Sequence, residues 1–390
     1  MTTRLYYSDS YLSEFDAAVV EVRPDPLRVY LDRTAFYPAS GGQPADTGLL
    51  GGSEVVDVLD EQDRVAHVIQ GPRPSGTVRG SLNWARRFDH MQQHSGQHLL
   101  SATLHEVLGV GTVSFHLGSE TSTIDVDAAT LDASQVAEIE LRVNRFACEN
   151  RPISVSFEDS GGDLNLRKPS ERAGLLRIVS IEGLDRSACG GTHVRSTGEI
   201  GPVLIRRLEK VRGNVRIEFL CGLRAVRRAR ADLDALSRIA RVFSAALDET
   251  PELVRAQSER LAEAERQRRK LAVELARRRG RELYAAAPPG PRGLRLYEGP
   301  PAAVIYDEVR AEAQAFVEGA AAAYLAVASS PPSILLALSA DAPLNAGETI
   351  KGLLARHGGR GGGNAAMAQG SLPSKEALER VAEELRALLR

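Results

Sequence analysis

Two short motifs constrain this chain more than any other feature, because together they predict a contact between distant segments. HSGQH contains His94 and His98 four residues apart, and CGGTH contains Cys189 and His193 with the same spacing. Imidazole and thiolate groups in such pairs are typical zinc ligands, and residues four apart on a helix share a face. The pattern predicts one zinc ion per chain, bound between a helix and a glycine-rich loop. Zinc beside a substrate carbonyl promotes hydrolysis, so a metal-dependent hydrolase is the leading hypothesis.

The choice of ligands and the role of the metal leave alternatives. His90 lies four residues before His94 on the same helical face and is an alternative ligand. A zinc protease of the HExxH type needs Glu where this chain has Ser95. Four protein ligands also describe a closed structural site with no position for water. Catalysis then requires a five-coordinate ion, a ligand that yields to water, or water that attacks from elsewhere while zinc orients the substrate.

Length and composition indicate a reduced, multidomain protein. A chain of 390 residues exceeds what one hydrophobic core usually organises. The N-terminus has no signal-peptide pattern and no apolar run is long enough to span a bilayer, so we expect a cytoplasmic protein without a membrane partner. Three cysteines are too few for a disulfide framework, which leaves Cys189 free to ligate. The net charge of −2 does not indicate a general polyanion binder.

The order of predicted elements indicates a multidomain α+β fold with four parts. Residues 1–89 read as short strands with turns and predict a small β-barrel. Residues 90–222 predict the α+β zinc-binding domain. Residues 223–287 predict a charged helical hairpin or coiled-coil spacer that Pro251 divides into two arms, and residues 288–390 predict a small α/β domain.

Capping and turn signals predict several element boundaries. A helix is expected to begin after Asp89, with Gln92 in the capping-box position, and to end near Gly109. Further expectations are helix caps at Asp132 and at Asn345 with Glu348, a hairpin turn at Gly213 and Asn214, and strands at 302–309, 323–330 and 333–340. Within the barrel, Gly41 and Gly42 allow backbone amides to approach a ligand, and Asp46 can hold their loop.

Three motifs together resemble one family. HSGQHLL, SACGGTHV and FYPASGGQPADTG look like the editing half of alanyl-tRNA synthetase and its free-standing relatives, the AlaX proteins. LRKP at 166–169 and VRIEFLCG at 215–222 fit as well. The glycine-rich tail at 358–370 is similar to the DHH-associated domain that ends alanyl-tRNA synthetases. The resemblance therefore covers nearly the whole chain, as in the long AlaX subgroup.

The resemblance implies a trans-editing hydrolase that removes serine from mischarged tRNA(Ala). Glycine is a further candidate for the acyl group that it removes. It assigns zinc to His94, His98, Cys189 and His193. Backbone amides of Gly190, Gly191 and Thr192 are expected near the developing oxyanion. Gly41, Gly42 and Gln43 resemble the loop that faces the editing centre. The chain begins at the barrel, so no tRNA charging is expected, and the absence of a DHH triad argues against phosphoesterase activity.

The remaining candidate residues have weaker support. Gln97 stands where the synthetase motif commonly has Thr, and it is a candidate reader of the serine hydroxyl. Ser114 and His116 are candidates for the pocket lining, and Arg167 and Lys168 for tRNA phosphates, together with Arg206, Arg207 and Arg212. For the helical arms, a solvated spacer, homodimerisation and tRNA contact remain open. The main alternative function is a zinc-stabilised RNA-binding or co-chaperone-like module without turnover, and a second is a deacylase for another misacylated tRNA.

Overall fold

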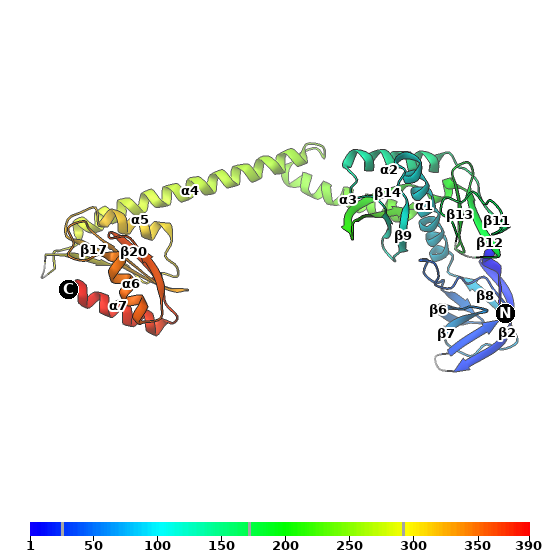
Figure 1. The fold of residues 1–390 in the computed structure, drawn as a ribbon, viewed down its shortest axis with the longest axis horizontal. Helices are drawn as coiled ribbons and strands as arrows, with labels where there is room; N and C mark the ends of the chain where they lie inside the picture. Colours follow the sequence, from blue (N-terminus) through cyan, green and yellow to red (C-terminus); the bar gives the residue numbers. More distant parts are fainter. Residues whose placement is uncertain (25–26, 171–172, 291–292) are drawn as a thin grey trace. The chain divides into compact units, whose positions relative to one another are not determined.

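The computed structural model describes residues 1–24, 27–170, 173–290 and 293–390 (Figure 1). The chain divides into two compact units, Met1–Ile239 and Ala240–Arg390. Both units combine helices with sheets, which confirms the expected multidomain α+β class. Within the described ranges, no helix has the length and apolar character needed to cross a bilayer.

Six N-terminal strands close into a barrel, in the order β2-β3-β7-β6-β5-β8. Their bounds are β2 Glu14–Pro24, β3 Leu27–Leu31, β5 Gly48–Leu50, β6 Ser53–Glu61, β7 Arg64–Gln70 and β8 Thr77–Leu82. Inward-facing residues such as Val29, Leu31 and Val58 form its apolar core, as expected where strands alternate between buried and exposed side chains. Beside the barrel, β1 (Thr3–Arg4) pairs in parallel with β4 (Arg33–Thr34), and a short 3-10 helix spans Leu5–Tyr7.

The helix that carries the first motif, α1, spans Trp84–Leu108. It begins earlier than predicted, because Asn83 at the end of the barrel accepts a hydrogen bond from the Arg86 amide and is the N-cap. The cap expected at Asp89 is therefore wrong. Asp89 lies inside the helix, and its carboxylate instead accepts hydrogen bonds from Arg224. The predicted end is confirmed, since Gly109 adopts a left-handed conformation with φ 67°.

Two further sheets and a second helix complete the first unit. One sheet has the order β14-β15-β10-β9 and the other β11-β12-β13. The bounds are β9 Thr112–Leu117, β10 Ser122–Val126, β11 Ile153–Asp159, β12 Leu175–Ile181, β13 Asp185–Ala188, β14 Val203–Val211, β15 Asn214–Cys221, α2 Ala133–Cys148 and a 3-10 helix Thr197–Ile200. The predicted Asp132 cap of α2 is confirmed, with a full capping box through Gln135.

The hairpin between β14 and β15 turns one residue earlier than predicted. Arg212 and Gly213 form the turn, with φ of 51° and 90°. Asn214 already pairs with Val211 in the ladder. Positive φ at two consecutive residues is typical of the tight hairpin turn whose twist matches that of the strands. Glycine adopts positive φ without a steric cost, so Gly213 suits this turn.

Two helices follow the first motif-bearing domain. They are α3 (Gly222–Phe243) and α4 (Thr250–Ala286). Pro251 lies in the first turn of α4, where proline is tolerated, and so separates the two helices as predicted. The unit boundary falls within α3, after Ile239. Leu261, Leu271 and Leu275 of α4 are exposed, so these apolar positions form no core in the described structure.

The second unit is built on a five-stranded sheet with the order β16-β17-β18-β20-β19. Its elements are β16 Arg295–Glu298, β17 Ala322–Ser329, β18 Pro332–Leu338, β19 Arg360–Gly363, β20 Met367–Ser371, α5 Asp307–Phe316, α6 Ala346–Arg356 and α7 Lys375–Leu389. One face packs on α6 and α7, and the other on α5 and the end of α4 (Figure 1). Burial of both faces explains the continuous apolar runs in β17 and β18.

Two expectations for this unit have different outcomes. Asn345 is the N-cap of α6, as predicted, and accepts from the Glu348 amide. The strand expected at 302–309 is wrong, because Asp307 and Glu308 begin α5. Acidic side chains in a first helical turn interact favourably with the helix dipole, whereas the apolar run before them is too short to decide between helix and strand.

Candidate metal centre

The four predicted ligands meet in the first unit. The described structure brings together one ligand atom from each of His94, His98, Cys189 and His193, all within 4.8 Å of one another. Cys189 Sγ lies 3.4 Å from His94 Nε2 and 3.3 Å from His193 Nε2. Ligand atoms around a tetrahedral zinc ion, with bonds of roughly 2.0–2.3 Å, are separated by roughly 3.5 Å. The arrangement therefore fits a zinc ion.

The fold positions these ligands by two different means. His94 and His98 occupy successive turns of α1, and their ring centroids are 5.3 Å apart. From His90 to Leu104 every residue of α1 is buried, so both histidines are held within packed protein. Cys189 directly follows β13, and the loop of Gly190, Gly191 and Thr192 leads to His193. A helix and a strand end thus supply a rigid support on each side of the site.

Each of the three histidines has a hydrogen-bond partner at Nδ1. His94 Nδ1 lies 2.8 Å from Gln43 Oε1, His98 Nδ1 lies 3.2 Å from Asp185 Oδ2, and His193 Nδ1 lies 3.1 Å from Ser95 Oγ. Partners at one ring nitrogen leave the other nitrogen to face a metal, and they orient the ring. Sequence reasoning did not identify Ser95 or Asp185 as such partners.

The electrostatics favour the thiolate of Cys189. Burial raises the pKa of Cys189, but electrostatic interactions and hydrogen bonds with the imidazoles of His94 and His193 outweigh it, so the pKa falls well below 9.0. For His98, burial lowers the pKa, but hydrogen bonds with Asp185 and Cys189 have the opposite effect, and the net result is a pKa raised to about 9. The deprotonated sulfur is the form that binds metal.

A buried arginine contacts the loop that carries Cys189. Arg177 on β12 donates from Nη1 to the Cys189 carbonyl at 2.7 Å and from Nε to the Tyr7 carbonyl at 3.1 Å. Burial has the largest effect on the guanidinium and lowers the pKa of Arg177, whereas electrostatic attraction to the Cys189 sulfur acts in the opposite direction. This cation helps to hold a negatively charged ligand in a buried site. No motif in the sequence identified Arg177.

The alternative ligand, His90, does not join the cluster. It is buried, burial lowers its pKa to about 4, and its Nδ1 has no hydrogen-bond partner in the described structure. The metal group formed by the described residues contains His94 and His98 instead.

Two predicted oxyanion donors are already engaged. The Gly191 amide donates to Cys189 Sγ at 3.4 Å, and the Thr192 amide donates to Gln43 Oε1 at 3.1 Å. The oxyanion role of Gly190, Gly191 and Thr192 stays a prediction. Gly191 is required for a different reason, because a Cβ there would overlap the His94 ring. Gly190 has more space, since a Cβ there would lie 3.7 Å from Tyr7 Oη.

The glycine-rich loop of residues 36–48 reaches the centre from the barrel. Gly41 and Gly42 have φ of 54° and 83°, and a Cβ on Gly42 would lie 2.8 Å from the Phe115 ring. Asp46 holds the base of this loop, as predicted: it accepts from the Tyr37 amide at 2.7 Å and pairs with Arg87. Gln43 of the loop contacts His94 directly, whereas no described contact links Gly41 to the ligands.

The pocket-lining candidates on β9 lie on its other face. Phe115 points toward the centre, with its ring centroid 5.4 Å from that of His94. Ser114 and His116, its two neighbours, are exposed, and Ser114 donates to Asp125. Successive residues of a strand face opposite sides, so the residue between the two candidates is the one at the site.

The remaining candidates are placed as follows. Gln97 is buried in α1 and donates from Nε2 to Ser101 Oγ at 2.9 Å. Arg167 donates to Asp185 Oδ1 at 2.7 Å and so supports the partner of His98. Lys168 is exposed. Arg167 is thus linked to the centre through Asp185, whereas the roles of Gln97 and Lys168 stay predictions.

Comparison with known proteins agrees with these features. Residues 176–218 match the "Threonyl and Alanyl tRNA synthetase second additional domain", and residues 311–390 match the DHHA1 domain. The chain is 37% identical over 242 residues to the alanyl-tRNA editing protein AlaX-M of Methanosarcina acetivorans, covering 56% of this chain and 98% of that protein.

Longer relatives match over part of their length. The alanyl-tRNA editing protein AlaX-L of Pyrococcus horikoshii is 36% identical over 241 residues, covering 58% of this chain and 59% of that protein. The alanine–tRNA ligase of Pyrococcus abyssi is 31% identical over 418 residues, covering 98% of this chain and 44% of the ligase. With the AlaX-M relative matched almost completely and the DHHA1 domain at its end, the chain belongs to the AlaX family of alanyl-tRNA editing proteins in a long form.

Proposed function

We propose that this protein is a zinc-dependent hydrolase that removes serine from mischarged tRNA(Ala). The observation that carries the proposal is the buried group of His94, His98, Cys189 and His193, found in a chain of the AlaX family. Zinc bound there would act as a Lewis acid on the aminoacyl ester carbonyl. One ion per chain is proposed, with glycine as a further acyl group.

The chain's own residues hold and orient the reacting groups. Gln43, Asp185 and Ser95 orient the three imidazoles through Nδ1, and Arg177 holds the Cys189 backbone. Burial of the three histidines lowers the local dielectric constant, which strengthens electrostatic interactions with a developing negative charge.

Selection for serine can be assigned to Gln97. Its Nε2 donates to Ser101 Oγ, and Ser101 Oγ in turn accepts from Thr112 Oγ1 at 2.7 Å. This chain of hydrogen bonds leaves Gln97 Oε1 as an acceptor for the substrate hydroxyl. Alanine lacks that hydroxyl and would leave the acceptor unpaired, at a cost of roughly 1–3 kcal/mol. The need for such a second site arises because a pocket for alanine rejects an added hydroxyl only weakly.

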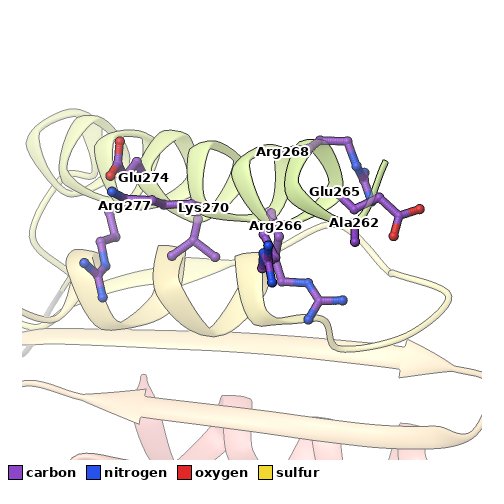
Figure 2. A pocket seen from close by; sticks show the side chains of 9 residues that line it. Ala262, Glu265, Arg266, Arg268, Lys270, Glu274 and Arg277 are labelled. Carbon is purple, nitrogen blue, oxygen red and sulfur yellow. The ribbon is translucent and has the colours of Figure 1, made fainter. Parts of the chain in front are cut away.

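Contact with tRNA is proposed for the second unit as well. A hollow on the surface of α4 is lined by five basic residues together with Ala262, Glu265, Val273 and Glu274 (Figure 2). The basic residues are Arg266, Arg268, Arg269, Lys270 and Arg277. Within the described structure, Arg269 and Lys270 have no ion pair, unlike Arg255 nearer the start of the helix, which pairs with Glu252. Free cations of this kind bind phosphates and release counterions.

The tRNA contact is tested by binding at several salt concentrations. Arg269→Gln with Lys270→Gln is expected to weaken tRNA binding and to reduce its salt dependence, since fewer counterions are released. The control is Arg255→Gln, which removes a paired cation from the same helix. Equal binding by both variants would exclude this part of α4 as a tRNA contact and leave homodimerisation or a solvated spacer.

The central experiment compares hydrolysis of Ser-tRNA(Ala) and Ala-tRNA(Ala) by zinc-loaded protein. We expect fast serine release, little alanine release, and loss of activity in His94→Ala with His98→Ala. His105→Ala is the matched control, because His105 is an exposed histidine of the same helix. No release above the spontaneous rate, from folded protein with zinc bound, would favour the alternative of a zinc-stabilised RNA-binding module, which the four-ligand set also fits.

A further inference from the structure

Gln43 joins three segments that are far apart in the sequence. It lies in the glycine-rich loop, where its backbone amide and carbonyl both pair with Ser40, and the residue is 2% exposed. Its Oε1 is 2.8 Å from His94 Nδ1 on α1 and 3.1 Å from the Thr192 amide nitrogen in the CGGTH loop. Its Nε2 donates to Thr192 Oγ1 at 2.8 Å. The barrel loop therefore contacts both halves of the metal centre through one side chain.

These contacts determine the protonation of His94. A backbone amide can only donate, so the Gln43 atom facing Thr192 N must be the carbonyl oxygen. The same oxygen faces His94 Nδ1, which must then carry the proton. His94 Nε2 is left with its lone pair directed toward the cluster, 3.4 Å from Cys189 Sγ. The orientation of Gln43 thus sets the tautomer that His94 needs to bind a metal.

From this geometry we infer that Gln43 is a positioning residue for the metal centre, not a substrate contact. It holds His94 in the metal-binding tautomer and ties the CGGTH loop to the barrel. Metal binding and the order of the glycine-rich loop are then linked. The inference deepens the proposed function and rests on it for the identity of the metal.

Two substitutions separate positioning from substrate contact. Gln43→Met keeps the length of the side chain but removes the acceptor, so His94 loses its constraint. Partners of metal-bound histidines typically contribute 10–100-fold to metal affinity, and we expect zinc affinity to fall by roughly that factor. Gln43→Glu keeps an acceptor for both His94 Nδ1 and the Thr192 amide, and the Thr192 hydroxyl can reverse its role and donate. Its zinc affinity is expected to equal or exceed that of the wild type.

The measurements are zinc affinity by competition with a chelator, and the visible spectrum of the cobalt-substituted protein. Retained zinc affinity in folded Gln43→Met, with only a raised KM for the acylated tRNA, would overturn the inference. If Gln43→Met does not fold, Gln43→Glu carries the test, and loss of zinc affinity in that variant also overturns it. Both readouts need no turnover, so wild-type protein that binds zinc without releasing serine would contradict the proposed function alone.

Discussion

Asp46 and Arg87 form an ion pair whose side chains are 1% and 0% exposed, and this pair joins the glycine-rich loop to α1. Arg87 also donates to the carbonyls of Ser10, at 2.8 Å, and Ala35, at 2.5 Å. Ala35 directly precedes the loop and Asp46 lies near its end, so Arg87 contacts both ends of the loop. The position of Gln43 relative to His94 therefore depends on a buried charge pair that contacts neither of them.

Neutralising Asp46 should strongly destabilise the first unit. Asp46→Asn leaves the Arg87 charge buried without its counter-ion, and breaking a buried pair in this way typically costs roughly 3–5 kcal/mol. The measurement is the free energy of unfolding in urea. Glu14→Gln is the control, because Glu14 pairs with Arg79 on the exposed surface of the barrel. Equal effects of the two substitutions would show that burial of the pair does not matter.

Removing zinc should lower stability without unfolding the protein. The two apolar cores of the first unit are built from side chains that do not bind the metal, so we expect them to persist without it. Ligand binding to the folded state alone stabilises it by about 2.7 kcal/mol at 100 times the Kd. We expect thermal unfolding to shift upward on zinc addition in the wild type and not in Cys189→Ala. A chelated protein that loses its far-ultraviolet circular dichroism would instead identify zinc as the structural element of the fold.

Two neighbouring glycines should respond differently to alanine. Gly191→Ala places a Cβ against the His94 ring, so the ring or the loop must move and zinc affinity should fall by roughly tenfold or more. Gly190→Ala meets Tyr7 Oη at 3.7 Å, an ordinary contact, and should leave affinity unchanged. Chelator competition on both variants checks this. A similar loss in both would indicate that loop flexibility, not space beside His94, requires glycine.

Gln97→Met should reduce serine release selectively. Losing one acceptor for the substrate hydroxyl should lower kcat/KM for Ser-tRNA(Ala) by roughly 10–100-fold, while the slow release of alanine and the zinc affinity stay unchanged. Ser101→Ala removes the hydrogen bond that orients Gln97 and should give a smaller loss. Deacylation rates with the two substrates test both variants, and an equal decline for serine and alanine would assign Gln97 to packing.

His67 should make the barrel sensitive to acid. Its Nδ1 donates to the Val29 carbonyl at 2.9 Å, its Nε2 accepts from Thr34 at 2.8 Å, and burial lowers its pKa from 6.5 to about 4. The unfolded chain therefore binds a proton first as the pH falls. Stability from neutral His67 is complete above pH 6.5 and is lost toward pH 4, by about 2 kcal/mol at pH 5.

The check is the free energy of unfolding at pH 7.5 and pH 5. In His67→Gln the difference between these two values should shrink by the contribution of one histidine. His105→Gln removes an exposed histidine and should retain the wild-type difference. If both variants behave like the wild type, acid sensitivity arises elsewhere.

The sequence alone determined the ligands and much of the secondary structure. Spacing identified His94, His98, Cys189 and His193, because a helix and a short loop keep residues four apart in a defined relation. Local chemistry likewise predicted the end of α1 at Gly109 and the cap of α2 at Asp132. It was wrong where two local signals competed. Asp89 resembles a cap as much as Asn83 does, and only the end of β8 shows which one begins α1.

Only the tertiary structure decided what surrounds the ligands. Gln43 and His94 are 51 positions apart, and His98 and Asp185 are 87 positions apart, so neither contact has a local signature. On β9, a difference of one residue separates Phe115 at the centre from Ser114 and His116 on the other face, since strand side chains alternate. Motif spacing identifies the metal ligands because each pair of ligands lies within one short segment of the chain. Their hydrogen-bond partners come from other elements, and packing between those elements alone selects them.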